Sequence, residues 1–216
     1  MLVQKQSRKY FQWRQNSYLN NTPMKKQEIT VDRGKKIFVF DNVFEASFRA
    51  SLYQFAMETE YKIGWNDTND IENKEHCYFH SKVSLHKFEE LKLYETLKKS
   101  EVYPLITHKF PYNFIINCSH PSDTNFAHTH VNTTLLYYAN SSWKPEWAGE
   151  TLFFNEEMTE VLFTSVYKPG RIILFDGGIP HTIRSQSRYG PQYRFTYTVF
   201  FDENEGLTDR LSNLSQ

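Results

Sequence analysis

The stretch that decides the fold covers residues 125–140, which read NFAHTHVNTTLLYYAN. Two histidines, His128 and His130, stand two positions apart and shortly before an apolar run that is typical of a buried strand. Side chains at positions i and i+2 of an extended chain point to the same side, so both imidazole rings can converge on one point. The pair is therefore a candidate half of a metal site.

Strand-like segments continue on both sides of this stretch. Gly, Pro, Asn and Ser turn residues separate short β-type runs at 114–118, 134–138, 151–154, 171–175 and 193–201. Many short strands with regular turn signals indicate a sandwich or a barrel. We therefore expect a jelly roll over residues 111–201.

Helical patterns precede the predicted strands. The apolar run 37–40 predicts a first strand, and Asn42 with Glu45 three residues later forms a capping-box pattern. Apolar side chains then recur at helical spacing over 43–60 and again over 86–100. We expect a mostly β domain that is supported by N-terminal helices over 41–100.

A third histidine, His181, follows the predicted strand 171–175 and a Gly-Gly turn. It stands 51 residues after His130 (181 − 130), which leaves room for several strands between them. A metal site on a β-scaffold needs this layout, with two ligands at one strand end and a third on a neighbouring strand. His128, His130 and His181 are thus the candidate metal ligands and catalytic residues.

The charges balance overall, but they are unevenly distributed. The chain has 216 residues with 25 Lys and Arg against 25 Asp and Glu, so no global charge favours nucleic acid or a membrane surface. Residues 1–36 carry nine basic and two acidic residues, a net charge of +7. We expect a basic N-terminal extension over 1–36 that is available to an acidic partner or is simply solvated.

The remaining composition indicates one soluble domain. No window approaches 18 uncharged apolar residues, so we expect no membrane span. Cys77 and Cys118 are too few for a disulfide framework, and we expect reduced thiols in a cytoplasmic protein. The expected domain covers 37–205, with a C-terminal tail over 206–216; the pattern does not set the oligomeric state.

The motifs beyond the histidines resemble those of the iron(II) and 2-oxoglutarate-dependent dioxygenases, in the branch related to prolyl 4-hydroxylases. The resemblance covers residues 113–201 in order. Besides the histidines it rests on Leu135–Asn140, Trp143, Trp147–Thr151, Lys168–Asp176, Ile179–His181 and Tyr193–Thr196. It implies a double-stranded β-helix, the cupin-like form of the jelly roll.

The resemblance also implies roles for single residues. His181 corresponds to the distal iron ligand, and Arg194 to the base that pairs with the C5 carboxylate of the co-substrate 2-oxoglutarate. A planar guanidinium suits that task because it binds a carboxylate through two parallel hydrogen bonds. Tyr138 and Thr196 are candidates for hydroxyl contacts to the same carboxylate.

The chain departs from the family at the carboxylate ligand, because the usual site has two histidines and one carboxylate. Two registers remain. In the first, the ligands are His128, His130 and His181; in the second, they are His130, Asn132 and His181. We favour the first because residues 131–133 then supply a turn before the strand. Three neutral imidazoles would leave the full +2 charge on the metal. The missing carboxylate has two other conceivable consequences: halide binding with halogenation, and loss of activity.

The function implied by the resemblance is hydroxylation of an unactivated C–H bond in a small-molecule or peptidyl substrate, with O2 and 2-oxoglutarate giving succinate and CO2. One rival is a three-histidine cupin-like metalloenzyme that does not use 2-oxoglutarate, such as a thiol dioxygenase or a zinc hydrolase. Another is a binding module that has lost catalysis.

Loops over 61–86, 119–127 and 184–192 are expected to select the substrate. The candidate residues at the rim of the substrate pocket are His120, Asp123, Arg184 and Arg188.

Overall fold

The computed structural model describes residues 23–64, 79–121, 123 and 125–203. Its elements in chain order are β1 (Lys25–Thr30), η1 (Asp32–Gly34), β2 (Lys36–Asp41), α2 (Ala46–Glu58), β3 (Lys62–Ile63), β4 (Phe79–Val83), α4 (Leu85–Glu90), α5 (Leu93–Leu97), η2 (Tyr103–Leu105), β5 (Phe110–Ser119), β6 (Thr133–Tyr138), η3 (Pro145–Trp147), β7 (Thr151–Phe154), β8 (Val161–Ser165), β9 (Ile172–Asp176), β10 (His181–Ile183) and β11 (Arg194–Asp202).

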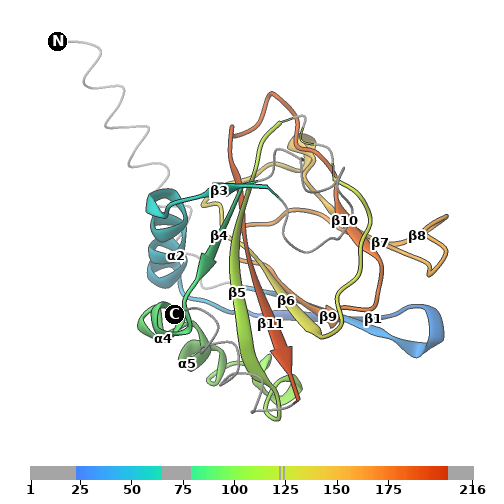
Figure 1. The fold of residues 1–216 in the computed structure, drawn as a ribbon, viewed down its shortest axis with the longest axis horizontal. Coiled ribbons are helices and arrows are strands. Elements are labelled where there is room, and N and C mark those ends of the chain that lie inside the picture. Colours follow the sequence, from blue (N-terminus) through green and yellow to red (C-terminus); the bar gives the residue numbers. More distant parts are fainter. Residues whose placement is uncertain (1–22, 65–78, 122, 124, 204–216) are drawn as a thin grey trace.

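The strands form two antiparallel sheets that enclose the site. The larger sheet has the order β1-β2-β9-β6-β11-β5-β4-β3, and the smaller has the order β10-β7-β8. Figure 1 shows the smaller sheet beside the larger one and the helices α2, α4 and α5 on the opposite side. The predicted fold, a mostly β jelly roll with N-terminal helices, is confirmed. All five predicted strands of the C-terminal half are present.

Alternation along β11 decides which side chains reach the core and which reach the interior of the barrel. Phe195, Tyr197, Val199 and Phe201 are buried in the cluster that packs against the helices. The intervening residues, from Arg194 to Phe200, point to the other face because side chains alternate along a strand. The polar members of this inner row therefore lie inside the barrel.

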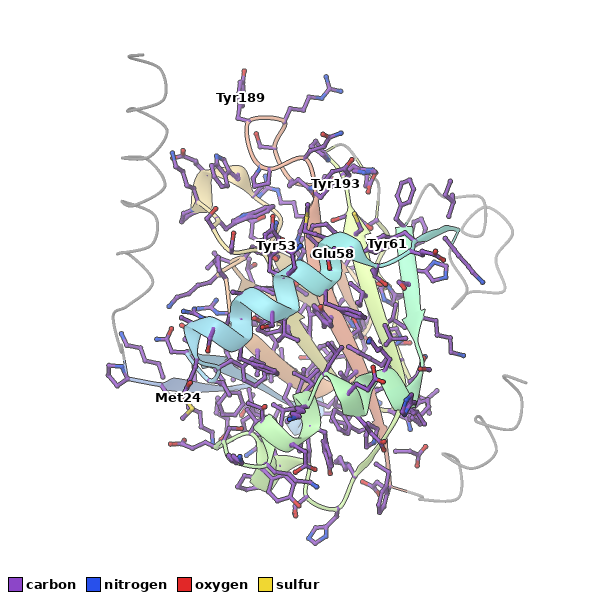
Figure 2. The ribbon with its side chains drawn as sticks, turned by 90° about the vertical axis from the view of Figure 1, so that its left-hand side faces the viewer. Met24, Tyr53, Glu58, Tyr61, Tyr189 and Tyr193 are labelled. Carbon is purple, nitrogen blue, oxygen red and sulfur yellow. The ribbon has the colours of Figure 1, made fainter. Side chains whose placement is uncertain are left out.

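Helix α2 covers the large sheet and confirms the helix predicted over 43–60 (Figure 2). Tyr53 lies 6.1 Å from the ring of Phe195, and Tyr61, beyond the helix end, lies 6.2 Å from it. The Tyr61 hydroxyl donates to the carbonyl of Ala56 (2.6 Å). These aromatic contacts fix the helix on β11, the strand that carries the inner polar row.

The predicted capping box at Asn42 is wrong. The N-cap residue is Glu45, and no side chain caps this helix. Asn42 has a positive φ of 61°, and its side-chain amide donates to the carbonyl of Pro23 (3.4 Å). The tight turn after β2 therefore uses the conformational tolerance of Asn, and its side chain is directed away from the helix.

The single helix predicted over 86–100 is wrong in one respect, because two short helices, α4 and α5, occupy this segment. Lys92 adopts a left-handed conformation with φ 55°, and its backbone N–H donates to the carbonyl of Glu89 (2.8 Å). The break turns the chain so that Leu93 and Leu97 both become fully buried. Burial of these side chains offsets the cost of the positive φ.

The hairpin of β1 and β2 spans the expected domain boundary at residue 36, with Ile29 paired to Ile37. Strand β1 is mostly exposed and polar, which is why it carries no apolar alternation. Residues 1–22, the tail 206–216 and Cys77 lie outside the described residues. The acidic partner of the basic extension stays a prediction.

In the described part of the chain, no helix has the length and apolar character needed to cross a membrane. Cys118 is a buried free thiol, and its burial raises the pKa of this thiol to about 12. The cytoplasmic location stays a prediction.

Asp41 at the end of β2 joins this strand to the turn before β9. Its carboxylate accepts hydrogen bonds from Lys168 Nζ (2.8 Å), Arg171 Nε (2.8 Å) and Arg171 Nη2 (3.1 Å). Burial acts to raise the pKa of Asp41, but the hydrogen bonds and charges of Arg171 and Lys168 outweigh it and hold the pKa below its usual value. The carboxylate thus stabilises the fold in its charged form.

We predict that Asp41→Asn lowers the free energy of unfolding at pH 7 by about 3 kcal/mol, because it leaves Arg171 without its buried partner. The folded pKa is depressed, so this contribution is present above the ordinary value of 3.8 and is lost as pH falls through the folded pKa. The difference between wild type and variant, measured by urea denaturation, should therefore shrink below about pH 4. Glu28→Gln, which breaks the exposed pair with Lys36 in the same hairpin, should cost less than about 1 kcal/mol. Equal losses in the two variants would contradict the assignment.

Candidate metal centre

Backbone hydrogen bonds bring the three candidate histidines together from two segments. The N–H of His128 donates to the carbonyl of His181, and the N–H of His181 donates to the carbonyl of His128, both at 3.0 Å. The N–H of His130 donates to the carbonyl of Gly177 (2.7 Å). The segment before β6 therefore pairs with the start of β10, and this pairing closes the separation of 51 residues in sequence.

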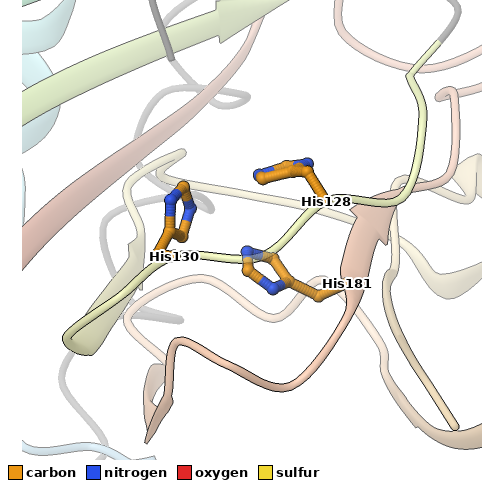
Figure 3. A group of neighbouring side chains, drawn as sticks. All are labelled: His128, His130 and His181. Atoms are coloured by element: carbon orange, nitrogen blue, oxygen red, sulfur yellow. The ribbon is translucent and has the colours of Figure 1, made fainter. Parts of the chain in front are cut away.

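The three imidazole rings face one shared space (Figure 3). Their centroids lie 4.9 Å apart for His128 and His130, 4.6 Å for His128 and His181, and 5.0 Å for His130 and His181. One ring nitrogen from each residue lies within 4.8 Å of the other two. Because metal–nitrogen bonds are about 2.1 Å long, a small rotation of the rings would place all three nitrogens on one ion. The side chains therefore fit a divalent metal.

Hydrogen bonds fix the tautomers of two of the rings. Nδ1 of His128 lies 3.1 Å from the carbonyl of Phe126, and Nδ1 of His181 lies 2.8 Å from the carbonyl of Ile179. A carbonyl only accepts, so each Nδ1 carries the proton and each Nε2 keeps its lone pair. This is the arrangement in which a neighbouring backbone carbonyl orients a metal-binding histidine.

Burial keeps the rings of His130 and His181 uncharged. It lowers the pKa of His130 to about 3, with a smaller contribution from the nearby His128. Burial also holds the pKa of His181 well below its usual value, and the charges of His128 and His130 act in the same direction. Neutral imidazole is the form that binds a metal, so His130 and His181 are ready as ligands at neutral pH.

Asn132, a ligand of the second register, has its side chain bound elsewhere in the structure. The side-chain amide of Asn132 donates to Oδ2 of Asp202 at 2.6 Å, and the Asn132 carbonyl accepts from the N–H of Gly177 at 3.1 Å. These bonds direct Asn132 toward the end of β11. Gly177 is required here, since a Cβ at this position would lie 2.3 Å from the Asn132 carbonyl and 2.8 Å from Cβ of His130.

A cavity of about 300 Å³ opens beside the histidines. Its described lining comes from both sheets: Gly64, His80, Lys82, Asn113, Ile115, Asn117, His128, His130, Thr134, Leu136, Thr151, Phe175, His181, Thr182, Ile183, Thr198 and Phe200. The described part of the segment 61–86, expected to be a substrate-selecting loop, instead contains β3 and β4, and His80 and Lys82 on β4 line the cavity. Sequence reasoning missed Asn113 and Asn117 as cavity residues. The available signal was polar side chains at alternate positions of short strands, as in Phe-His-Ser-Lys-Val over 79–83.

Arg194 is the first residue of β11, and it does not belong to the described cavity lining. It is only 1% exposed, and its Nε donates to the carbonyl of Gly149 (2.9 Å). Its guanidinium carbon lies 4.7 Å from the ring centre of Tyr167 and 5.4 Å from that of Tyr138. Gly149 has φ +83°, and a Cβ there would lie 3.3 Å from the Arg194 side chain, so glycine fits both the conformation and the contact.

Tyr138 and Thr196 flank Arg194. The Tyr138 hydroxyl donates to Oγ1 of Thr151 (2.7 Å), which lines the cavity. Thr196 is fully buried, and within the described residues its hydroxyl has no hydrogen-bond partner. Arg194 and Thr196 share the inner row of β11 with Thr198 and Phe200, which line the cavity. The three predicted co-substrate residues therefore lie together, but none of them belongs to the described cavity lining; Tyr138 reaches it only through Thr151.

The four expected rim residues do not belong to the cavity lining. His120 packs against the rings of Phe79 (4.9 Å) and Tyr193 (5.0 Å), and its backbone N–H donates to Oδ2 of Asp123 (2.6 Å). Arg184 and Arg188 are exposed.

The jelly-roll fold is similar to that of several solved 2-oxoglutarate and iron(II) oxygenases. A prolyl hydroxylase from Trichoplax adhaerens, in complex with a peptide fragment of the hypoxia inducible factor oxygen degradation domain, has 14% identity and a TM-score of 0.56 over 83% of this chain and 87% of that chain. A 2OG-Fe(II) oxygenase family oxidoreductase from Burkholderia pseudomallei has 13% identity and a TM-score of 0.54 over 76% and 83% of the two chains.

HygX from Streptomyces hygroscopicus, with nickel and 2-oxoglutarate bound, has 9% identity and a TM-score of 0.54 over 76% of this chain and 82% of that chain. No protein-family model and no curated protein sequence matches the chain. These similarities show a shared fold.

We predict that Ni²⁺, added at about 100 times its Kd, stabilises the full-length protein by about 2.7 kcal/mol in urea denaturation. His128→Ala and His181→Ala should lose this stabilisation, because each removes a ligand nitrogen. Asn132→Ala should keep it, and so should His108→Ala, whose side chain is exposed. Loss of nickel binding in Asn132→Ala, with full binding in His128→Ala, would contradict the favoured register.

Proposed function

We propose that the protein is an oxidoreductase, a non-haem iron(II) and 2-oxoglutarate-dependent dioxygenase that hydroxylates an unactivated C–H bond. The observation that carries the proposal is the convergence of His128, His130 and His181 at a cavity of the jelly roll. Arg194 is buried on β11, the strand that also carries the cavity residues Thr198 and Phe200. The fold shared with 2-oxoglutarate oxygenases supports it.

The histidines would hold the metal and leave coordination positions open on the cavity side. When bound, iron(II) supplies the redox chemistry in which O2, 2-oxoglutarate and a substrate C–H bond give succinate, CO2 and an alcohol. One oxygen atom enters succinate and the other enters the alcohol. The substrate and 2-oxoglutarate each supply two of the four electrons that reduce O2. The neutral imidazoles leave the full +2 charge on the metal, which favours a dianionic co-substrate.

Arg194 would bind the C5 carboxylate of 2-oxoglutarate through its guanidinium. Its bond to the Gly149 carbonyl and its packing on Tyr138 and Tyr167 fix the plane of the group before any ligand arrives. Burial strengthens a charged hydrogen bond because little water competes for it. The hydroxyl of Thr196, which has no partner among the described residues, would add a neutral contact to the same carboxylate. The Tyr138 hydroxyl donates to Thr151, so its predicted contact would require that bond to be exchanged for one to the ligand.

The walls of the cavity would orient the substrate and limit access of water. Phe175, Leu136 and Phe200 provide the apolar part of the lining, and the Phe200 ring lies 4.7 Å from His130. A dry wall beside the metal protects a reactive centre from side reactions. In such a site the cofactor carries out the chemistry, and the protein side chains orient the reactants.

A second function draws on the donor set itself. Three histidine nitrogens with no carboxylate also match a catalytic zinc site, so a metalloenzyme that does not use 2-oxoglutarate is the alternative. The remaining alternative is a barrel that binds ligands without catalysis. Succinate formation coupled to O2 consumption separates the proposal from both.

We predict that anaerobic addition of iron(II) and 2-oxoglutarate gives the weak visible charge-transfer band of the chelate. His181→Ala should lose the band, because the metal loses a ligand. Arg194→Gln should raise the Kd for 2-oxoglutarate about 100-fold, a loss of roughly 2.7 kcal/mol, because the carboxylate keeps no charged partner. Arg33→Gln, which changes a largely exposed arginine, should behave as wild type.

Turnover provides the second measurement. Wild type should form succinate with O2 consumption, and zinc should not support it. A sharp gain of activity in Asn132→Asp, with His128 dispensable, would contradict the His128 register.

A further inference from the structure

The cavity has a polar patch that the proposed metal and co-substrate contacts do not use. We call it the Lys82 patch: His80 and Lys82 on β4 and Asn113 and Asn117 on β5. The register pairs His80 with Asn117 and Lys82 with Ile115. Opposite residues of an antiparallel pair share a face, so Asn113 and Asn117 are the diagonal neighbours of Lys82, about 7–8 Å away at the backbone. Figure 1 shows β4 and β5 side by side, followed in the sheet by β11.

The charge of this patch is positive. Among the described residues that line the cavity, Lys82 is the only Lys, Arg, Asp or Glu, so it carries the only formal charge of these side-chain types. Within the described residues no carboxylate forms an ion pair with Lys82. A cavity lined by one sign of charge attracts the opposite sign, so the patch favours an anionic ligand group. One ammonium is a compact point charge and suits a single carboxylate.

The patch also presents an unused acceptor. Asn113 Oδ1 is buried, and it accepts no hydrogen bond from the described residues. A buried acceptor without a partner destabilises the protein, so a ligand N–H or O–H placed there would recover that free energy. The amide of Asn117 is already oriented, because its Nδ2 donates to Oγ1 of Thr198 (3.0 Å). The patch therefore offers both a cation and a hydrogen-bond acceptor.

Size restricts the ligand further. The cavity volume of about 300 Å³ is at the low end for ligand sites, and the co-substrate would share this space. Small molecules fit such a space better than a folded protein segment does.

We infer that the substrate is a small carboxylic acid that carries an amino or hydroxyl group. Lys82 pairs with its carboxylate, and Asn113 Oδ1 accepts a hydrogen bond from its amine or hydroxyl. This inference rests on the proposed function. The hydroxylated product keeps both recognition groups, since the reaction changes only a C–H bond.

The test uses the full-length protein loaded anaerobically with iron(II) and 2-oxoglutarate, with the charge-transfer band as proof of loading. The probes are the proteinogenic L-amino acids and their 2-hydroxy analogues, each compared with its methyl ester by isothermal titration calorimetry. At least one acid should bind about tenfold more tightly than its ester, the factor expected for one partly exposed ion pair.

Variants assign the contacts. Lys82→Met should weaken binding of that acid about tenfold and leave binding of its ester unchanged. Lys99→Met, an exposed lysine outside the cavity lining, should bind both as wild type does. Asn113→Leu should weaken binding of the acid but not binding of the analogue that lacks the amine or hydroxyl.

Three outcomes would overturn the inference while leaving the proposed function intact. In the first, the loaded protein binds no acid of the panel; in the second, it binds a proline-containing peptide amide more tightly than any acid. In the third, the Lys82→Met variant loses binding of 2-oxoglutarate instead of binding of the acid. Absence of the band in wild type would overturn both.

Discussion

The two backbone hydrogen bonds between His128 and His181 are the constraint on which the rest of the site depends. They join the segment before β6 to the start of β10, and so they connect the large sheet with the small one. The third imidazole belongs to the small sheet and the first two precede a strand of the large sheet, so this pairing is what brings the three rings together. The bond from His130 to the carbonyl of Gly177 completes the arrangement, and it requires a glycine because the Asn132 carbonyl occupies the space of a Cβ.

The backbone pairing of His128 with His181 has an electrostatic consequence. It buries His130 and His181 so far that their pKa values fall and both stay neutral at physiological pH. The described lining of the cavity contains no Asp or Glu. With Lys82 on one wall and Arg194 buried on β11, the interior has a positive character that suits acidic small molecules. The absence of a carboxylate ligand thus agrees with the chemistry of the whole cavity.

The two cations are held in different ways, and this indicates different roles. Arg194 is buried, packed against the rings of Tyr138 and Tyr167 and fixed by the Gly149 carbonyl, so its geometry is set before a ligand binds. Lys82 is exposed at the other side of the cavity and has a flexible stem. A rigid anchor suits a constant co-substrate, and a flexible cation suits the group that enters and leaves with each substrate.

Local patterns in the sequence determined the strand at 37–40, the five predicted strands of the C-terminal half and the placement of His128, His130 and His181 near strand ends, because alternation and turn residues act over a few positions. The strands β1, β3, β4, β8 and β10 were not predicted. The helix cap at Asn42 and the continuous helix over 86–100 were wrong, since a turn to Pro23 and a left-handed Lys92 depend on contacts distant in sequence. Only the tertiary structure decided that His80, Lys82, Asn113 and Asn117 line the cavity and that Asn132 is directed to Asp202. Strand order and register bring these side chains together, and pairing between distant strands leaves no periodic signal in the chain itself.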